Sequence, residues 1–146
     1  MAPANWDAPI ILSPHDARTV YAGTNILWKS IDRGNTWTAL GDRTTGIDRR
    51  TLPIMGRMPD AATRSLDDGV PYWPMVSAIA ESPRVRGDLW VGTDDGNVQH
   101  SVDGGRTWVA QAAGTTDNLR DVAAADRRVV WAAGLRTLLK TVTGGE

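Results

Sequence analysis

Short runs in which apolar and polar residues alternate recur along this chain, and turn residues separate them. Alternation over about four to eight residues is typical of a half-buried β-strand. The runs fall into three groups of similar layout. We therefore predict strands at 10–14, 20–24 and 27–30, at 76–83, 89–93 and 98–101, and at 119–123, 129–134 and 138–141.

The first two groups end in one pattern, S-x-D-x-G-x-T-W, which we call the first box (residues 30–37) and the second box (101–108). An Asp at the start of a turn accepts hydrogen bonds from the turn's own N–H groups, and a Gly two residues later supplies positive φ. The Thr and Trp begin the returning strand, and the indole clamps the turn onto its neighbour. We assign a structural role to Ser30, Asp32, Gly34, Thr36 and Trp37, and to Ser101, Asp103, Gly105, Thr107 and Trp108.

The spacing of the groups predicts the fold. Asp103 and Thr143, at equivalent positions of the second and third groups, are 40 residues apart, and a polar insertion lengthens the interval between the boxes. A period of about 40–45 residues with four short strands is typical of a β-propeller blade. The third group ends in 141–146, a box without its Asp or its Thr-Trp half. We predict an all-β partial β-propeller of about three four-stranded antiparallel blades, the last incomplete, at roughly 6–40, 72–112 and 117–146, with an inserted loop at 41–71.

The boxes, the Ser-Pro turns and the strands 21–24 and 90–93 resemble the Asp-box, or bacterial neuraminidase (BNR), repeat. That repeat occurs in sialidases, xyloglucanase-like glycoside hydrolases, sortilin-type receptors and photosystem II assembly-factor-like proteins. Residues 6–110 are most similar to large bacterial proteins of the glycosyl-hydrolase or sortilin-like type, and the part from 118 onward is more similar to the assembly-factor repeats. The resemblance implies a propeller fold and an extracytoplasmic location, periplasmic or secreted.

Composition excludes several functional classes. The 146 residues suffice for one domain with a sizeable core, and 16 basic residues balance 17 acidic ones for a net charge of -1, so we expect no binding to nucleic acid. The absence of cysteine excludes disulfides, zinc–thiolate sites and thiol catalysis. No apolar run approaches the roughly 18 residues of a membrane span, so we expect no membrane insertion, and the first residues lack the layout of a signal peptide.

Blade topology separates the boxes from the insertion. Successive turns of a four-stranded meander alternate between its two ends, so the boxes should lie at one end and the insertion and the turn at 94–97 at the other. Long loops on a rigid scaffold often carry function, arginines grip carboxylates or phosphates, and aromatic rings stack on sugars. The alternative is a solvated loop whose residues 52–55 cover apolar surface near the channel. The candidate ligand-face residues are Arg57, Asp67, Asp68, Tyr72, Trp73, Asp94 and Asp95.

The sequence identifies no metal site, cofactor or catalytic residue. Residues 94–97 lack the remainder of an EF-hand loop and are interpreted as a hairpin turn. His15 and His100 have no third ligand nearby and are interpreted as turn or surface residues. A glycosidase needs two carboxylates about 5–10 Å apart. Four carboxylates share the insertion's face, but no spacing singles out a pair among Asp67, Asp68, Asp94 and Asp95.

Three functional hypotheses remain. The first is a non-catalytic propeller module that acts as a binding scaffold for a protein or carbohydrate ligand. The second is a portion of a BNR-type glycoside hydrolase whose catalytic carboxylates lie partly in missing blades, and the third is an assembly-factor-like module that holds a partner polypeptide. Propellers close with four to eight blades, so we expect a fragment of a longer protein, a truncated product or a subunit. The remaining blades of a parent chain, or self-association, would then cover the open faces.

Overall fold

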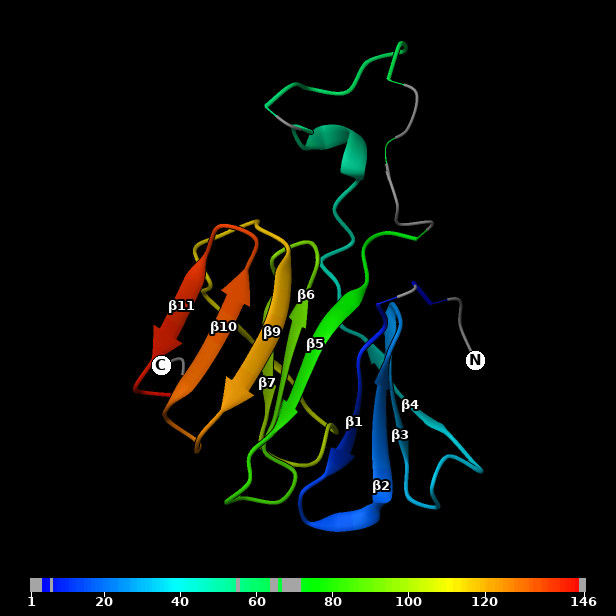
Figure 1. The fold of residues 1–146 in the computed structure, drawn as a ribbon, viewed down its shortest axis with the longest axis vertical. Helices are drawn as coiled ribbons and strands as arrows, with labels where there is room; N and C mark the ends of the chain where they lie inside the picture. Colours follow the sequence, from blue (N-terminus) through cyan, green and yellow to red (C-terminus); the bar gives the residue numbers. More distant parts are fainter. Residues whose placement is uncertain (1–3, 6, 55, 64–65, 67–71, 145–146) are drawn as a thin grey trace.

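The computed structural model describes residues 4–5, 7–54, 56–63, 66 and 72–144. Within these residues the chain forms three antiparallel sheets and one short 3-10 turn, η1 (Arg49–Thr51) (Figure 1). No helix among them is long and apolar enough to cross a membrane. The first sheet contains β1 (Ile10–Ser13), β2 (Asp16–Gly23), β3 (Ile26–Ser30) and β4 (Thr38–Asp42); the second contains β5 (Val76–Glu81), β6 (Leu89–Thr93), β7 (Val98–Ser101) and β8 (Val109–Gln111); the third contains β9 (Leu119–Ala124), β10 (Val130–Gly134) and β11 (Leu138–Thr141).

Each sheet is a meander in which neighbours in sequence pair antiparallel, in the orders β1-β2-β3-β4, β5-β6-β7-β8 and β9-β10-β11. The predicted all-β partial propeller is thereby confirmed, with three strands in the last sheet. The largest difference from expectation is in β2, which begins at Asp16 rather than near residue 20. Asp16 pairs with Ser13, whose Oγ accepts the N–H of His15 at 3.2 Å, so a tight turn starts β2 early.

The first and second sheets pack face to face. Their shared core contains no charged side chain, and its centre is fully buried. Gly23 permits the close approach, since a Cβ at this position would lie 2.7 Å from Cγ1 of Val76. Burial of each large side chain contributes roughly 1.5–3 kcal/mol. The core residues are Tyr21, Leu27, Val76, Ile79, Leu89 and Val91.

The second and third sheets form a separate core in which a tryptophan is central. The Trp90 side chain is almost fully buried and packs among smaller aliphatic residues of both sheets. A hydrogen bond from the hydroxyl of Ser77 to the carbonyl of Leu119 joins the innermost strands, β5 and β9. The second sheet therefore packs on both faces. The core residues are Ala78, Trp90, Val98, Leu119, Val122, Val130 and Ala132.

The outer faces of the stack remain apolar and exposed. On the first sheet, Ile10 and Leu12 of β1 are 68% and 64% exposed. On the third sheet, Trp131 of β10 and Leu138 of β11 are 40% and 69% exposed. Side chains of this kind lie between blades in the interior of the stack, so both outer faces are suited to packing against a further sheet.

Candidate functional site

The base of the insertion is fixed to the second sheet. The N–H and the hydroxyl of Thr45 donate to Oδ2 of Asp95 at 2.7 and 2.6 Å. The carbonyl of Arg43 accepts from the side-chain amides of Asn97 and Gln99 at 2.9 and 3.2 Å, and the Arg43 guanidinium donates to Oε1 of Gln99 at 2.9 Å. These bonds place the insertion at the β6–β7 end of the second sheet, as the blade topology predicts.

Asp95 lies inside the β6–β7 turn. The Thr93 hydroxyl donates to its Oδ1, and the Thr93 N–H donates to the carbonyl of Asn97 at 3.0 Å, which closes the turn. Gly96 has φ +81° and lies against the backbone of Thr116, which a Cβ would approach to 2.6 Å. The hairpin interpretation of residues 94–97 is confirmed. The carboxylate of Asp95 is buried and accepts hydrogen bonds from Thr93 of β6 and from Thr45 of the insertion, so it positions the insertion.

Asp94 is 9% exposed and exchanges backbone and side-chain bonds with Met75. The Met75 N–H donates to Oδ1 of Asp94 at 2.7 Å, and the Asp94 N–H donates to the Met75 carbonyl at 3.0 Å. Burial raises the pKa of Asp94 to about 7, and the charges of Asp95 and Asp7 act in the same direction. The adjoining cavity, which Asp7 and Asn118 also line, measures about 20 Å³. That space holds about one water molecule and no sugar ring.

The remaining candidate residues lie on the insertion or directly after it. Figure 1 shows that its middle part projects beyond the ends of the sheets. Arg57 is exposed, and its backbone pairs with that of Ile54 in a two-bond bridge of 2.7 and 3.0 Å. The backbone of Tyr72 exchanges hydrogen bonds with the Asn5 side chain at 2.8 and 3.1 Å, and the residue is 45% exposed. The Arg49 guanidinium lies 5.5 Å from the centre of the Trp73 ring.

The structure therefore brings together only part of the predicted ligand face. Asp94 and Asp95 are adjacent but buried, and no hydrogen bond or ion pair among the described residues joins either carboxylate to Arg57. Asp67 and Asp68 lie outside the described residues. Of residues 52–55, which the alternative interpretation assigns as a cover for apolar surface, 52 and 54 are half-buried and 53 is exposed, and none of these three belongs to either sheet-to-sheet core. Residue 55 lies outside the described residues. A ligand-binding role for these residues stays a prediction.

In the first box, groups of the turn itself donate hydrogen bonds to both carboxylate oxygens of Asp32. The Ser30 hydroxyl donates to Oδ1 of Asp32 at 2.8 Å and accepts the Gly34 N–H at 2.8 Å. The hydroxyl and N–H of Thr36 donate to the two carboxylate oxygens at 2.6 and 2.8 Å. The Thr36 hydroxyl is the main reason that the pKa of Asp32 falls to about 2. Thr36 and Trp37 precede β4, so the returning strand begins two residues later than the sequence indicates.

The second box repeats this geometry. Ser101 donates to Oδ1 of Asp103 at 2.9 Å and accepts the Gly105 N–H at 2.9 Å, and the Thr107 hydroxyl donates to Oδ2 at 2.6 Å. The Thr107 hydroxyl and N–H hold the pKa of Asp103 well below its usual range. Nε1 of Trp108 donates to the carbonyl of Gly105 within the same turn at 3.0 Å, and the side chain packs against the core between the first and second sheets.

The residue that follows the Asp position of each box, at 33, 104 and 144, also bonds to an earlier part of its own sheet. In the first box its N–H donates to a carbonyl of β2, and in the other two it donates to a carbonyl in the turn between the first two strands of the sheet. The third box keeps this contact although it lacks the Asp. Gly144 has φ +81° and completes the third turn. The bonds are Arg33 to Arg18 at 2.9 Å, Gly104 to Gly87 at 2.9 Å and Gly144 to Arg128 at 3.1 Å.

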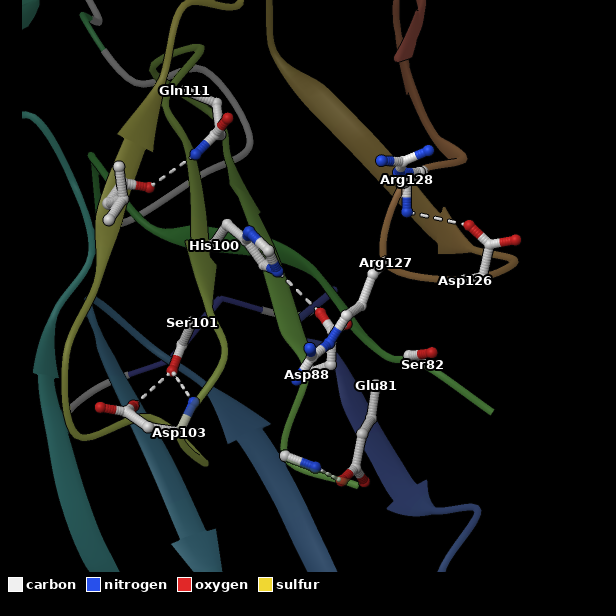
Figure 2. A network of polar contacts seen from close by, with 12 residues as sticks. Glu81, Ser82, Asp88, His100, Ser101, Asp103, Gln111, Asp126, Arg127 and Arg128 are labelled. Carbon is white, nitrogen blue, oxygen red and sulfur yellow. Dashed lines mark hydrogen bonds and ion pairs between the residues drawn. The ribbon is translucent and has the colours of Figure 1, made fainter. Parts of the chain in front are cut away.

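Sequence reasoning missed a buried polar network between the second and third sheets (Figure 2). Asp88 is fully buried; its Oδ1 lies 2.7 Å from Nε2 of His100, and its Oδ2 lies 3.4 Å from Nε of Arg127. The His100 ring stacks on Trp90 with centroids 3.9 Å apart. The interpretation of His100 as a turn or surface residue is therefore wrong, because its cross-strand partner Trp90 draws the ring into the sheet interface. His15 does lie in a turn, and its Nε2 is 2.8 Å from the Ser82 carbonyl.

No known family profile matches the sequence, and no curated protein is similar to it. Among solved structures, YCF48 bound to a D1 peptide superposes with a TM-score of 0.58 over 99% of this chain at 16% identity. YCF48 from Cyanidioschyzon merolae gives 0.62 over 99% at 16% identity, and the GH74 enzyme of Niastella koreensis gives 0.61 over 95% at 20% identity. This chain spans 43%, 39% and 22% of those chains. The likeness supports the β-propeller fold alone, and the BNR assignment stays a prediction.

Proposed function

We propose that this chain is a non-catalytic propeller module that binds a protein partner through the insertion. The observation that carries the proposal is the shape of that segment: its base is held by Arg43, Thr45 and Asp95, while residues 48–54 and 56–63 project into solvent (Figure 1). Small-molecule sites are concave. A projecting arm on a fixed base instead suits insertion into a groove of another protein.

The chemistry of the arm supports the same choice. Met58 is 58% exposed, Arg57 next to it and Arg50 earlier in the arm are exposed, and Tyr72 is exposed where the chain returns to the sheets. Arginine, methionine and aromatic residues are enriched in protein interfaces and supply most binding hot spots. One structural neighbour, YCF48, is itself known bound to a peptide.

The test compares partner affinity for the unaltered chain and for a variant whose residues 49–63 are replaced by a short Gly-Ser linker. Cross-linking with mass spectrometry identifies the partner, and titration calorimetry measures its affinity for each variant. We expect loss of the arm to weaken binding at least about tenfold, and Arg57→Ala with Met58→Ala to reproduce most of that loss. Arg120→Ala, at an exposed position of β9, is the matched control. Unchanged affinity without the arm would refute the proposal.

Glycoside hydrolysis is the second candidate, and Asp94 is the observation that favours it. A carboxyl group with a pKa of about 7 is suited to general acid catalysis near neutral pH. Its cavity of about 20 Å³ admits no sugar, so a substrate would need displacement of Asn5 or Asp7. Assays of this chain and of any longer parent protein on aryl glycosides and polysaccharides decide the matter. Turnover that disappears in Asp94→Asn would replace the first proposal with this one.

The apolar outer faces are proposed to pack against further blades, either from a longer chain or from a second copy. Ile10 and Leu12 on one face and Trp131 and Leu138 on the other have the character of the residues that fill the two internal cores. Light scattering after size exclusion should show concentration-dependent association of the isolated chain. Leu138→Glu should reduce that association, and a strictly monomeric chain at all concentrations would contradict self-association.

A further inference from the structure

A groove of about 270 Å³ lies between the first and second sheets at the box end, opposite the insertion. Its walls come from β1 to β3 on one side and from β5, the 82–88 turn and the second box on the other. Asp103 and Gly104 form part of its edge, so the second box borders a groove, although not one beside the insertion. The volume lies just below the range of about 300–1,000 Å³ that is typical of sites for drug-sized ligands, so it suits a smaller molecule.

Glu81 lines this groove with an incompletely bonded carboxylate. The side chain is 7% exposed. Its Oε1 accepts the N–H of Gly87 at 2.8 Å, whereas its Oε2 is buried and has no hydrogen-bond partner among the described residues. Tyr21 is buried beside Glu81. Its burial and, after that, the negative charge of Glu81 raise the pKa of Tyr21. A buried carboxylate oxygen without a donor is costly, and a ligand that donates to it recovers that cost.

Three cations border the same groove. Lys29, Arg86 and Arg106 line it, and none of them forms an ion pair with a described residue. The Lys29 ammonium lies 5.5 Å from the centre of the Tyr21 ring, and Arg86 donates one hydrogen bond to the backbone carbonyl of His15 at 2.8 Å. Their positive charge is therefore available to a ligand.

The other carboxylates on the groove are already engaged. Asp16 pairs with Arg18 at 3.4 Å and accepts the Arg18 N–H at 3.0 Å. Asp103 is bonded by its own turn through Ser101 and Thr107. The groove thus combines one buried hydrogen-bond acceptor, Glu81, with three cations at its border. A matching ligand carries a hydrogen-bond donor for Glu81 and a negatively charged group for the cations.

We propose that this groove binds a free α-amino acid, with its ammonium on the carboxylate of Glu81 and its carboxylate on Arg86, Arg106 and Lys29. An ammonium gives Glu81 a charge-assisted bond, and guanidinium groups bind carboxylates in a forked geometry. A ligand with only a carboxylate would leave Oε2 of Glu81 without a donor and would be repelled by the Glu81 charge. A ligand with only an ammonium group would be repelled by Lys29, Arg86 and Arg106. This site is independent of the partner-binding arm, so either proposal can fail without the other.

The experiment titrates the 146-residue chain with each of the free L-amino acids, using calorimetry and amide chemical shifts. The best binder is then compared with its N-acetyl derivative, its amide and acetate. We expect both blocked derivatives and acetate to bind at least about tenfold more weakly, because each lacks one of the two required groups. Binding of the N-acetyl derivative or of acetate at equal affinity would overturn the proposal, as would the absence of binding by every amino acid.

Substitutions locate the site. Glu81→Gln keeps an acceptor for the Gly87 N–H and should weaken binding about tenfold or more, with the shift changes confined to the groove. Arg86→Gln and Arg106→Gln alter exposed side chains and should each weaken binding several-fold with the fold intact, so they carry the test if Glu81→Gln does not fold. Arg120→Gln is the control. Equal affinity in all four variants would overturn the assignment.

Discussion

Asp94 makes the stability of this chain depend on pH in an unusual direction. Its carboxyl group is buried against Met75, with the acidic side chains of Asp95 and Asp7 nearby, so the folded chain disfavours its ionised form. Asp94→Asn removes the titratable proton and preserves an Oδ1 that can accept the Met75 N–H. The substitution therefore isolates the cost of ionisation from the contribution of the hydrogen bond.

The magnitude follows from the two pKa values. The pKa of Asp94 is 3.8 in the unfolded reference and about 7 in the folded chain, a difference that corresponds to roughly 4 kcal/mol as an upper limit. Below about pH 4 the group is protonated in both states, and its contribution to stability is greatest. As pH rises toward 7 the unfolded chain releases the proton and the folded chain keeps it, so stability is lost across this interval and levels off above it.

Other carboxyl groups act in a different pH window. The pKa values of Asp32 and Asp103 are lowered by their box turns, so their contribution is present above the unfolded value and is lost as pH falls below about 4. The difference between the two proteins from pH 4 to 7 therefore belongs to Asp94.

Urea unfolding at a series of pH values measures this difference. We expect Asp94→Asn to gain stability relative to the unaltered chain as pH rises, by up to a few kcal/mol at about pH 8. Asp121→Asn, on the exposed face of β9, should show no such trend. Parallel curves for the unaltered chain and Asp94→Asn between pH 4 and 7 would refute the reasoning.

Three further substitutions test the fold around the site. Asp95→Ala leaves the N–H and hydroxyl of Thr45 without an acceptor and should lower the free energy of unfolding in urea by about 1–3 kcal/mol. Proteases should also cleave the insertion faster in this variant, and unchanged cleavage would contradict the positioning role of Asp95. Asp103→Ala should lower Tm by several degrees, whereas Val102→Ala at the exposed neighbouring position should not. Gly23→Ala forces a Cβ to 2.7 Å from the second sheet and should cost about 1–3 kcal/mol, measured by thermal unfolding; a neutral effect would mean that the sheets can separate freely.

The sequence predicts the sheets well because their signals are local. Alternating runs give the strands of all three sheets, and the box turns bond within a few residues of the chain, so the hydrogen bonds of Asp32 and Asp103 follow from residue types and spacing. Because these bonds are local, the described part of the third box keeps one of them with Thr143 in place of Asp: the Thr143 N–H donates to the Thr141 hydroxyl, as the Asp32 N–H donates to Ser30. The early start of β2 at Asp16 is the exception, since a tight turn there depends on Ser13.

The environments of the candidate residues depend on contacts that are distant in sequence. The Asp-Asp-Gly-Asn segment indicates a hairpin, but the burial of Asp95 requires Thr45, fifty positions earlier, to fold over it. Glu81 is one of two glutamates in the chain and carries no local motif. Its unbonded oxygen exists only because the first and second sheets enclose it. The pairing of His100 with Asp88 depends on a shorter separation in sequence. The register of β6 and β7 places His100 opposite Trp90, which lies two residues after Asp88.

The face-to-face stacking of the sheets makes this chain a linear array, in which packing runs from the first sheet to the second and from the second to the third. In such arrays, stability is a sum of unit and nearest-neighbour contributions, and unfolding spreads inward from the ends. The sheet formed by β5 to β8 takes part in both interfaces, so its amides should exchange with solvent most slowly. When the first or the third sheet opens, the interface between the other two sheets stays intact. The ends of the array can therefore unfold locally while the second sheet remains folded.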